Sequence, residues 1–373
     1  MCRLGIYIIL ISITQGLFSQ DTIISSKKIS LLFIGDIMCH DEQLRSASKT
    51  DTSSYNFDDV FIFIKPLIME ADIAIANLEV TLDGSPYRGY PRFSSPVQLA
   101  EACRNAGIDY LVTANNHSAD RGKRGIINTI ARLDSLGVHH TGTFTCQAER
   151  DTAYPLIIRK NGASFALLNY TFGTNGIEVP SPVIVNMINN DQITADIIRA
   201  RELCPDKVIL FLHWGTEYDS IPSEIQHETA GYFIEAGADL VIGSHPHAIQ
   251  KMVWQTRKDG NKDEVIIYSL GNFVSNQRKQ GTDGGAMVKI DYEKEENQLV
   301  VSDAFYYLTW VYTPVTEDGK KFYILPCYRF ENDSTFFNSG KDYRKMKVFI
   351  NNSRRLLGNQ NINVRELQSH IDK

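Results

Sequence analysis

Short apolar runs rich in β-branched residues alternate with helical patterns from residue 29 to about residue 274, and this alternation limits the possible fold more than any other feature of the chain. Such an order of elements is typical of α/β layering, in which helices cover the faces of a sheet. The sequence therefore predicts an α/β fold. The expected strands are residues 29–34, 71–76, 110–113, 165–170, 207–212, 239–242 and 265–269, and the expected helices are residues 57–69, 96–106, 125–136 and 223–236.

Polar or titratable residues follow the expected strands one after another. In open α/β sheets, ligands gather at the carboxyl ends of the strands, so we expect these side chains to meet at one edge of one sheet. Each of them alone can also be a helix cap, a turn residue or a hydrogen-bonded core histidine. Their joint occurrence favours a chemical site made of Asp36, Asn77, Glu79, Asn116, His117, Asp120, His213, His245 and His247.

The most distinctive of these strand ends lies in residues 240–250, where an apolar run leads into a turn that carries His245 and His247. In extended backbone, residues two positions apart project to the same side, so we expect both imidazoles to be delivered together. Pro246 between them fixes its own φ and stiffens the turn. Two unrelated histidines on a surface loop are the alternative interpretation.

The residue types at these strand ends are those of a metal site. A mixture of imidazole, carboxylate and amide oxygen suits zinc, manganese or iron(II) better than calcium. Two ions that share one carboxylate would fit the number of candidate ligands, and such a centre activates water and stabilises the oxygens of an in-line displacement. We expect His117 to act as a general acid that Asp120 orients.

Other chemistries have weaker support. The chain has no P-loop or dinucleotide fingerprint, and Ser244 lies outside any Gly-x-Ser-x-Gly elbow. The cysteines after residue 20 form no C-x-x-C pair, which favours buried thiols over a disulfide framework and leaves a single bridge open. A buried thiol is also favoured over a nucleophile at Cys39. These cysteines are Cys39, Cys103, Cys146, Cys204 and Cys327.

Charge and the N-terminus indicate where the protein acts. A formal net charge of −6 argues against nucleic acid as the main partner. Arg3 precedes an apolar run at residues 4–13 and a small polar stretch, a pattern that predicts a secretory signal peptide over residues 1–20. The apolar run is too short for a membrane span. We therefore expect an exported protein of the periplasm or cell envelope.

Seven motifs follow one another in the chain, at residues 33–38, 76–79, 91–96, 114–122, 213–218, 243–247 and 269–273. In this order they resemble the CapA-like family, bacterial capsule synthesis proteins associated with poly-gamma-glutamate. They cover roughly residues 29–275, and the resemblance implies a calcineurin-like metallophosphoesterase fold, a β-sandwich flanked by helices. We expect residues 29–294 to form the CapA-like domain, and the sequence pattern predicts strands and a helix in residues 295–373 that complete the fold.

The resemblance also implies roles for single residues. It makes Glu79 the bridging carboxylate and places Met38 where the family pattern of metallophosphoesterases has a ligand histidine, so one metal position lacks a ligand and either one or two ions are expected. The implied metal ligands are Asp36, Glu79, Asn116, His213, His245 and His247. The expected substrate contacts are Asn77, Arg92, Glu217 and Asn272.

Three functions remain open from the sequence. The first is an exported metal-dependent hydrolase or transferase that acts on an anionic polymer or phosphoester in capsule synthesis, together with membrane partners. The second is a non-catalytic component that binds or guides the polymer in the same cleft. A metal-free scaffold is the third. Polymer binding would need a local group of cations, for which the candidates are Arg88, Arg92, Arg121, Lys123 and Arg124.

Overall fold

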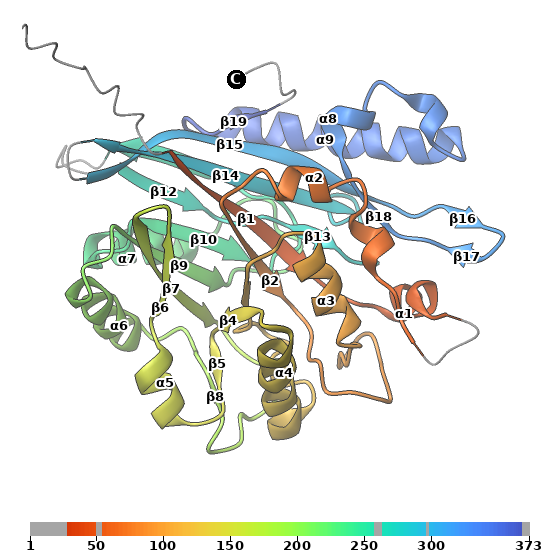
Figure 1. Ribbon diagram of the computed structural model, residues 1–373. Helices are drawn as coiled ribbons and strands as arrows, with labels where there is room; N and C mark the ends of the chain where they lie inside the picture. Colours follow the sequence, from red (N-terminus) through yellow and green to blue (C-terminus); the bar gives the residue numbers. More distant parts are fainter. Residues whose placement is uncertain (1–27, 50–53, 257–262, 296–297, 368–373) are drawn as a thin grey trace, which may run out of the picture.

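The computed structural model describes residues 28–49, 54–256, 263–295 and 298–367. In this part of the chain two large sheets face each other and helices cover their outer faces (Figure 1). The predicted α/β class, with a β-sandwich flanked by helices, is confirmed. The expected signal peptide at residues 1–20 lies outside the described residues.

The first sheet has nine strands in the order β18-β15-β14-β1-β2-β3-β4, with β13 paired to β1 and β19 paired to β15. Strands β1 to β4 run parallel to one another, and β14 runs antiparallel to both β1 and β15. The bounds are β1 Ile29–Ile37, β2 Ile73–Leu78, β3 Tyr110–Val112, β4 His139–Thr141, β13 Asn272–Val274, β14 Gly284–Glu295, β15 Gln298–Tyr312, β18 Tyr323–Pro326 and β19 Arg365–Glu366.

The second sheet has six strands in the order β11-β12-β10-β9-β7-β6. Its central strands are buried along their whole length, as expected for continuous apolar runs. The bounds are β6 Leu156–Lys160, β7 Ala163–Thr171, β9 Lys207–His213, β10 Leu240–Ser244, β11 Met252–Thr256 and β12 Asp263–Ile267. Two small sheets pair β5 Thr143–Phe144 with β8 Ile184–Val185, and β16 Val315–Thr316 with β17 Gly319–Lys320.

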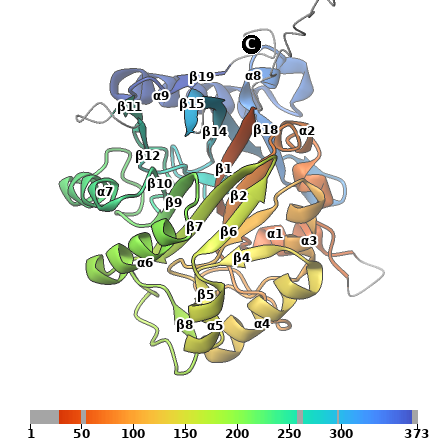
Figure 2. The same ribbon diagram turned by 60° about the vertical axis from the view of Figure 1, so that its left-hand side comes forward.

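Alternate residues of the strands build separate cores. Phe33 of β1 and Phe211 of β9 belong to one buried cluster between the sheets, whereas the next residues, Ile34 and Leu212, face helices on the outside. Helix α3 packs on the first sheet, and α6 and α7 pack on the second (Figure 2). The helices are α1 Asp41–Ala47, α2 Lys65–Ile68, α3 Gln98–Asn105, α4 Gly122–Leu136, α5 Gln147–Ala153, α6 Asn190–Glu202, α7 Glu224–Ala236, α8 Cys327–Phe330 and α9 Gly340–Gln360, with the 3-10 turns η1 Asp58–Phe61 and η2 Ser334–Phe336.

Local sequence signals explain where the predicted helices begin and end. Ser223 caps α7 in a capping box with Gln226, and Gly237 ends the helix at φ 119°. The expected helix at residues 57–69 is wrong, because the chain forms η1 and then the short α2. Pro66 lies inside the expected range, and a proline interrupts a helix unless it stands in the first turn, which is its place in α2.

The segment after residue 294 continues the first sheet. Strand β15 pairs along its length with β14, and α9 packs through Met346, Phe349 and Leu357 into the core between the sheets. In Figure 1 this helix lies along β15 at the upper edge of the molecule. No helix among the described residues is both long enough and apolar enough to cross a membrane.

The cysteines of the described residues are free thiols. Cys39, Cys103 and Cys327 are buried, as predicted, and burial raises the pKa of the Cys39 thiol to about 12, which does not favour a nucleophilic thiolate. The expectation of a buried thiol is wrong for Cys204, which is exposed, and Cys146 is half-buried.

Candidate metal centre

The first sheet brings two carboxylates together at the ends of β1 and β2. Asp36 lies beside Asn77 of β2 on one side and beside Asn272 of β13 on the other, and Glu79 follows directly after β2. Gly35 makes this approach possible, because a Cβ at that position would lie 2.1 Å from the carbonyl oxygen of Gly271. Both carboxylates are fully buried.

The second sheet supplies the histidines. His213 is the last residue of β9 and pairs with Ser244, the last residue of β10. His245 and His247 follow in a turn with φ values of 98° and 56°. The expectation of extended backbone is therefore wrong. Both histidines have a positive φ, in the left-handed region that residues other than glycine rarely adopt.

These residues lie close together, as predicted. The expectation that they all lie at one edge of one sheet is wrong. Asp36 and Glu79 come from one sheet and the three histidines from the other, and they meet where the two sheets face each other. Nδ1 of His247 lies 3.0 Å from Oδ2 of Asp36, and the backbone N of His245 lies 3.4 Å from the same oxygen. Nε2 of His213 lies 3.7 Å from Oε1 of Glu79.

Two groups of side chains could each hold a metal ion. One consists of Asp36, Glu79 and His247, and the other of Glu79, His213 and His245, with all ligand atoms of a group within 4.8 Å of one another. Glu79 belongs to both. The turn at Pro246 therefore directs one imidazole to each group, which the sequence spacing alone does not predict.

The charges of the site fit a cation. No Lys or Arg among the described residues forms an ion pair with Asp36 or Glu79, although both are buried. Burial, followed by the negative charge of Asp36, raises the pKa of Glu79 well above its usual value. Its Oε1 is buried without a hydrogen-bond donor. A buried carboxylate in this state requires a proton or a cation.

The histidines fit the same cation. Burial lowers the pKa of His213 well below its usual value, and burial together with nearby His247 lowers the pKa of His245 to about 3. Both rings are therefore neutral at pH 7, which is the form that binds metals. Nδ1 of His245 is buried without a hydrogen-bond partner, as a free ligand atom would be.

A hydrogen-bond network beneath the candidate ligands holds them in place. Nδ2 of Asn77 donates to Oδ1 of Asp36 at 2.8 Å and lies 3.3 Å from Oε2 of Glu79. Because this amide is fully buried, it orients the carboxylates and has no surface left for substrate. Nε2 of His213 lies 3.0 Å from Oδ1 of Asn116.

Two members of this network were not among the predicted site residues. Asn115 donates from Nδ2 to Oδ1 of Asn77 at 3.2 Å and accepts from the backbone N of His117 at 3.1 Å. Oγ of Ser244 lies 2.9 Å from Nδ1 of His213. The only sequence signal for either was its position next to a predicted ligand.

His117 and Asp120 form the expected pair at the border of the site. Nδ1 of His117 donates to Oδ2 of Asp120 at 2.8 Å, and the same oxygen accepts from the backbone N of Phe93 at 2.7 Å. The edge of the Phe93 ring packs against the imidazole, with centroids 4.7 Å apart. This arrangement fixes the orientation of the ring and leaves Nε2 for other contacts.

The other predicted substrate contacts differ in position. Arg92 and Glu217 are exposed, whereas Asn272 is buried and donates from Nδ2 to Oε1 of Gln277 and to the carbonyl oxygen of Thr282. Of the cations considered for polymer binding, Arg121 and Arg124 form ion pairs with buried Asp83, so their charges are compensated.

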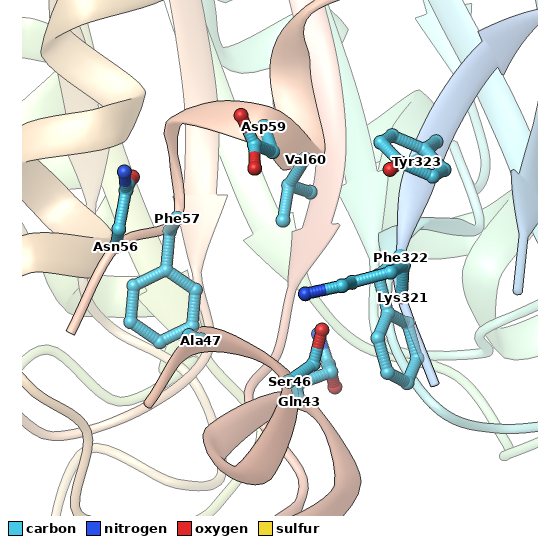
Figure 3. Close-up of a pocket in the computed structure, with 10 residues that line it drawn as sticks. All are labelled: Gln43, Ser46, Ala47, Asn56, Phe57, Asp59, Val60, Lys321, Phe322 and Tyr323. Atoms are coloured by element: carbon cyan, nitrogen blue, oxygen red, sulfur yellow. The ribbon is translucent and has the colours of Figure 1, made fainter. Parts of the chain in front are cut away.

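The pocket in Figure 3 is separate from the candidate ligands, none of which lines it. It lies between α1, η1 and the start of β18, and its volume of about 30 Å³ is too small for a substrate. The residues around it are Gln43, Ser46, Ala47, Asn56, Phe57, Asp59, Val60, Lys321, Phe322 and Tyr323.

Fold and site define an α/β protein with a candidate metal centre between the edges of two sheets. The chain belongs to the bacterial capsule synthesis protein family PGA_cap, whose sequence model matches residues 30–277. It is 28% identical to the capsule biosynthesis protein CapA of Bacillus anthracis over 289 residues, covering 74% of this chain and 67% of that protein. It is 26% identical to the PGA biosynthesis protein CapA of Bacillus subtilis, covering 72% and 69%. The resemblance inferred from the motifs is confirmed.

Solved structures similar to this chain include the NAD nucleotidase of Haemophilus influenzae, with a TM-score of 0.49, 11% identity and coverage of 92% of this chain and 64% of that one. A calcineurin-like phosphoesterase of Bacillus subtilis has a TM-score of 0.42 and 12% identity, and the match covers 88% of this chain and 98% of that one.

Proposed function

We propose that this protein is a metal-dependent hydrolase or transferase that acts on poly-gamma-glutamate, or on a phosphoester linked to its synthesis, at the cell envelope. The observation that carries the proposal is Oε1 of Glu79, which is buried, lacks a hydrogen-bond donor and lies 3.7 Å from Nε2 of both His213 and His247. Ligands of one ion, each about 2.0–2.2 Å from it, lie at comparable separations. Membership of the capsule synthesis family supports a role in capsule synthesis.

The donor atoms point to zinc, manganese or iron, as one ion or as a pair that shares Glu79. Asp36 and His247 would complete one position, and His213 and His245 the other, with the amide oxygen of Asn116 near His213. A divalent ion in such a site lowers the pKa of bound water and polarises a phosphoryl or carbonyl oxygen.

The protein's own residues would orient the substrate and transfer a proton. Asp120 holds Nδ1 of His117, so Nε2 is the atom that would donate a proton to a leaving group. The exposed side chains of Arg92 and Glu217 remain proposed substrate contacts. Proposed partners are an anionic polymer or phosphoester and membrane proteins of capsule synthesis, with no role for nucleic acid. We also propose that the protein is exported, which the N-terminal sequence pattern supports.

A non-catalytic polymer-binding component is the alternative function. It is favoured by Met38, which stands where a further ligand would be needed and is 1% exposed, in the core between α1 and the first sheet. The group around Asp36 therefore has only three candidate ligands. Such a site could bind a carboxylate of the polymer through the ion without turnover.

Metal analysis followed by a substrate panel tests the proposal. Protein purified without chelator should contain zinc, manganese or iron, and should cleave or transfer one member of a panel of γ-glutamyl and phosphoester substrates. Absence of metal, together with an unchanged melting temperature after addition of zinc or manganese, would contradict both functions. Bound metal without turnover, and polymer binding that is lost in His245→Ala, would favour the alternative.

A further inference from the structure

A groove of about 510 Å³ opens beside the candidate metal centre, within the size range of ligand sites. Four parts of the chain form its walls: the loop that follows β9, the loop that follows β10, the loop before β14, and one side of α9. The residues that line it are Tyr218, Ser220, Ala248, Ile249, Gln280, Gly281, Asn352, Ser353, Arg355, Leu356, Asn359 and Gln360.

One end of the groove lies next to the turn that carries His247, although no candidate ligand lines the groove itself. Ala248 and Ile249 directly follow His247 in the chain. The backbone N of Tyr218 donates to the carbonyl oxygen of Pro246 at 2.7 Å, and its ring lies 6.2 Å from the ring of His247. The groove therefore ends beside the turn that delivers His247 to the buried group of Asp36, Glu79 and His247.

The groove is positively charged although the chain is acidic overall. Arg355 lines it, and Nζ of Lys279, which does not line the groove but precedes Gln280, lies 3.6 Å from the centre of the ring of Tyr218, another lining residue. Neither cation has a carboxylate within ion-pair distance among the described residues, and no acidic residue lines the groove. Lys345, Lys347 and Arg354 of α9 are paired with Asp342, Glu331 and Glu366, so the positive charge of the groove rests on Arg355 and Lys279.

The remaining polar groups of the groove are mostly primary amides. Gln280, Asn352, Asn359 and Gln360 line the groove, and their side chains make no hydrogen bond to any other described residue. Each amide offers both donors and an acceptor, so together they match a chain of amide bonds, which has both kinds of group. A phosphate backbone offers acceptors only and would leave the amide oxygens unused.

The loop that carries Lys279 and Gln280 is held in a fixed position relative to the candidate metal centre. Nδ2 of Asn272 donates to Oε1 of Gln277 at 3.0 Å and to the carbonyl oxygen of Thr282 at 2.8 Å, so it bridges both ends of the loop. Asn272 itself pairs with Asp36 in the first sheet. The loop is thus arranged for binding before a ligand arrives.

We propose that this groove binds several units of an amide-linked polycarboxylate chain and leads it to the candidate metal centre. Arg355 and Lys279 contact the carboxylates, and the amides of Gln280, Asn352 and Asn359 contact the linking amide bonds. The inference rests on the proposed function, and it places the polymer of that function along α9. It assigns a binding role to the segment after residue 294, for which the sequence suggested only completion of the fold.

Binding of γ-linked glutamate oligomers to the full chain tests this groove. Affinity should rise with oligomer length in wild type, and Arg355→Glu or Lys279→Ala should each weaken binding of a long oligomer by about tenfold. Lys341→Glu is the matched control, because it changes charge in the first turn of the same helix outside the groove and should leave affinity within about twofold. Circular dichroism and melting temperature confirm that each variant is folded.

Three outcomes would overturn the proposal. The first is that both groove variants bind the oligomer with wild-type affinity. The second is that the Lys341→Glu control loses as much affinity as the groove variants. The third is that polyphosphate binds more tightly than an oligoglutamate of equal charge. Measurement with and without EDTA separates this proposal from the proposed function. Length-dependent binding by protein that holds no metal and shows no turnover even without EDTA would contradict only the enzyme, whereas metal and turnover with unchanged binding in the variants would contradict only the groove.

Discussion

Oε1 of Glu79 and Nε2 of His247 lie 3.7 Å apart, both buried, although they belong to loops that leave different sheets. The same oxygen lies 3.7 Å from Nε2 of His213. Each of these distances is too long for a hydrogen bond and suits two ligands of one ion, Glu79 with His247 in one group and Glu79 with His213 in the other. Glu79 is therefore the residue on which the two candidate metal positions depend together.

Glu79→Gln should lower metal occupancy at least about tenfold without destabilising the metal-free protein. The substitution removes a carboxylate that burial and the charge of Asp36 make unfavourable, so the melting temperature in EDTA should be unchanged or higher. Metal analysis and calorimetry measure both effects. Full occupancy in the variant would show that Glu79 is no ligand.

His213→Ala and His247→Ala should each weaken metal binding by at least about tenfold, because each removes a candidate ligand from a different group. His227→Ala is the control. His227 is exposed on α7, where its Nδ1 lies 2.7 Å from the hydroxyl of Tyr268, and it belongs to neither group. Equal occupancy in all three variants would refute the assignment.

The left-handed backbone at His245 predicts an unusual order of stabilities. At φ 98°, glycine avoids the strain that any Cβ causes, so metal-free His245→Gly should be more stable than His245→Ala by about 1 kcal/mol. On α7 the order should be reversed, with His227→Gly less stable than His227→Ala by a similar amount, about 1 kcal/mol. Denaturant titration in EDTA measures both pairs. A more stable alanine variant at residue 245 would contradict the argument.

The strands and their polar ends were predictable because continuous apolar runs mark buried strands and the candidate ligands directly follow them. The pairing of those strands was not predictable, since nothing in the run that ends at His213 shows which sheet it joins. The left-handed turn at His245 and His247 was missed for a related reason. Its backbone is determined by contacts between the sheets, among them the one from the backbone N of His245 to Asp36.

Strand β14 is a second case in which contacts between distant parts of the chain, and not the local sequence, determine the structure. It begins with Gly284 and Gly285, which in sequence end a loop, and this strand was not predicted. A Cβ at Gly284 would lie 2.3 Å from the carbonyl oxygen of Thr309 and 2.7 Å from the Phe349 ring, so the glycine is required by distant neighbours and not by a local turn. Patterns within a short window cannot reveal such a requirement.

Asp120→Asn should lower turnover by about 10²- to 10⁴-fold and leave metal occupancy unchanged. Oδ2 of Asp120 accepts from both His117 and the backbone N of Phe93, and an asparagine amide cannot stabilise the same protonation state of the imidazole. Comparison of the pH profiles of kcat for wild type and variant separates this role from simple loss of structure. An unchanged profile with full activity would remove His117 from the mechanism.

The C-terminal segment should be held to the fold by the ion pairs of Arg354. Its guanidinium donates to Oε2 of Glu331 at 2.7 Å and to Oε2 of Glu366 at 2.7 Å, which joins α9 to α8 and β19. Glu331→Gln should therefore lower the free energy of unfolding at pH 7 by about 2 kcal/mol, the range for hydrogen bonds to charged groups.

The loss of unfolding free energy in Glu331→Gln should become smaller as the pH falls. Hydrogen bonding to Arg354 lowers the pKa of Glu331 below its usual value of 4.5. A carboxyl group whose folded pKa is depressed stabilises the fold above the unfolded pKa and loses that contribution as pH falls through the folded pKa. The difference between wild type and Glu331→Gln should therefore be constant from about pH 6 to 8 and shrink below about pH 4.5. Denaturant titrations across this range measure it, and a difference that grows on acidification would contradict the assigned ion pair.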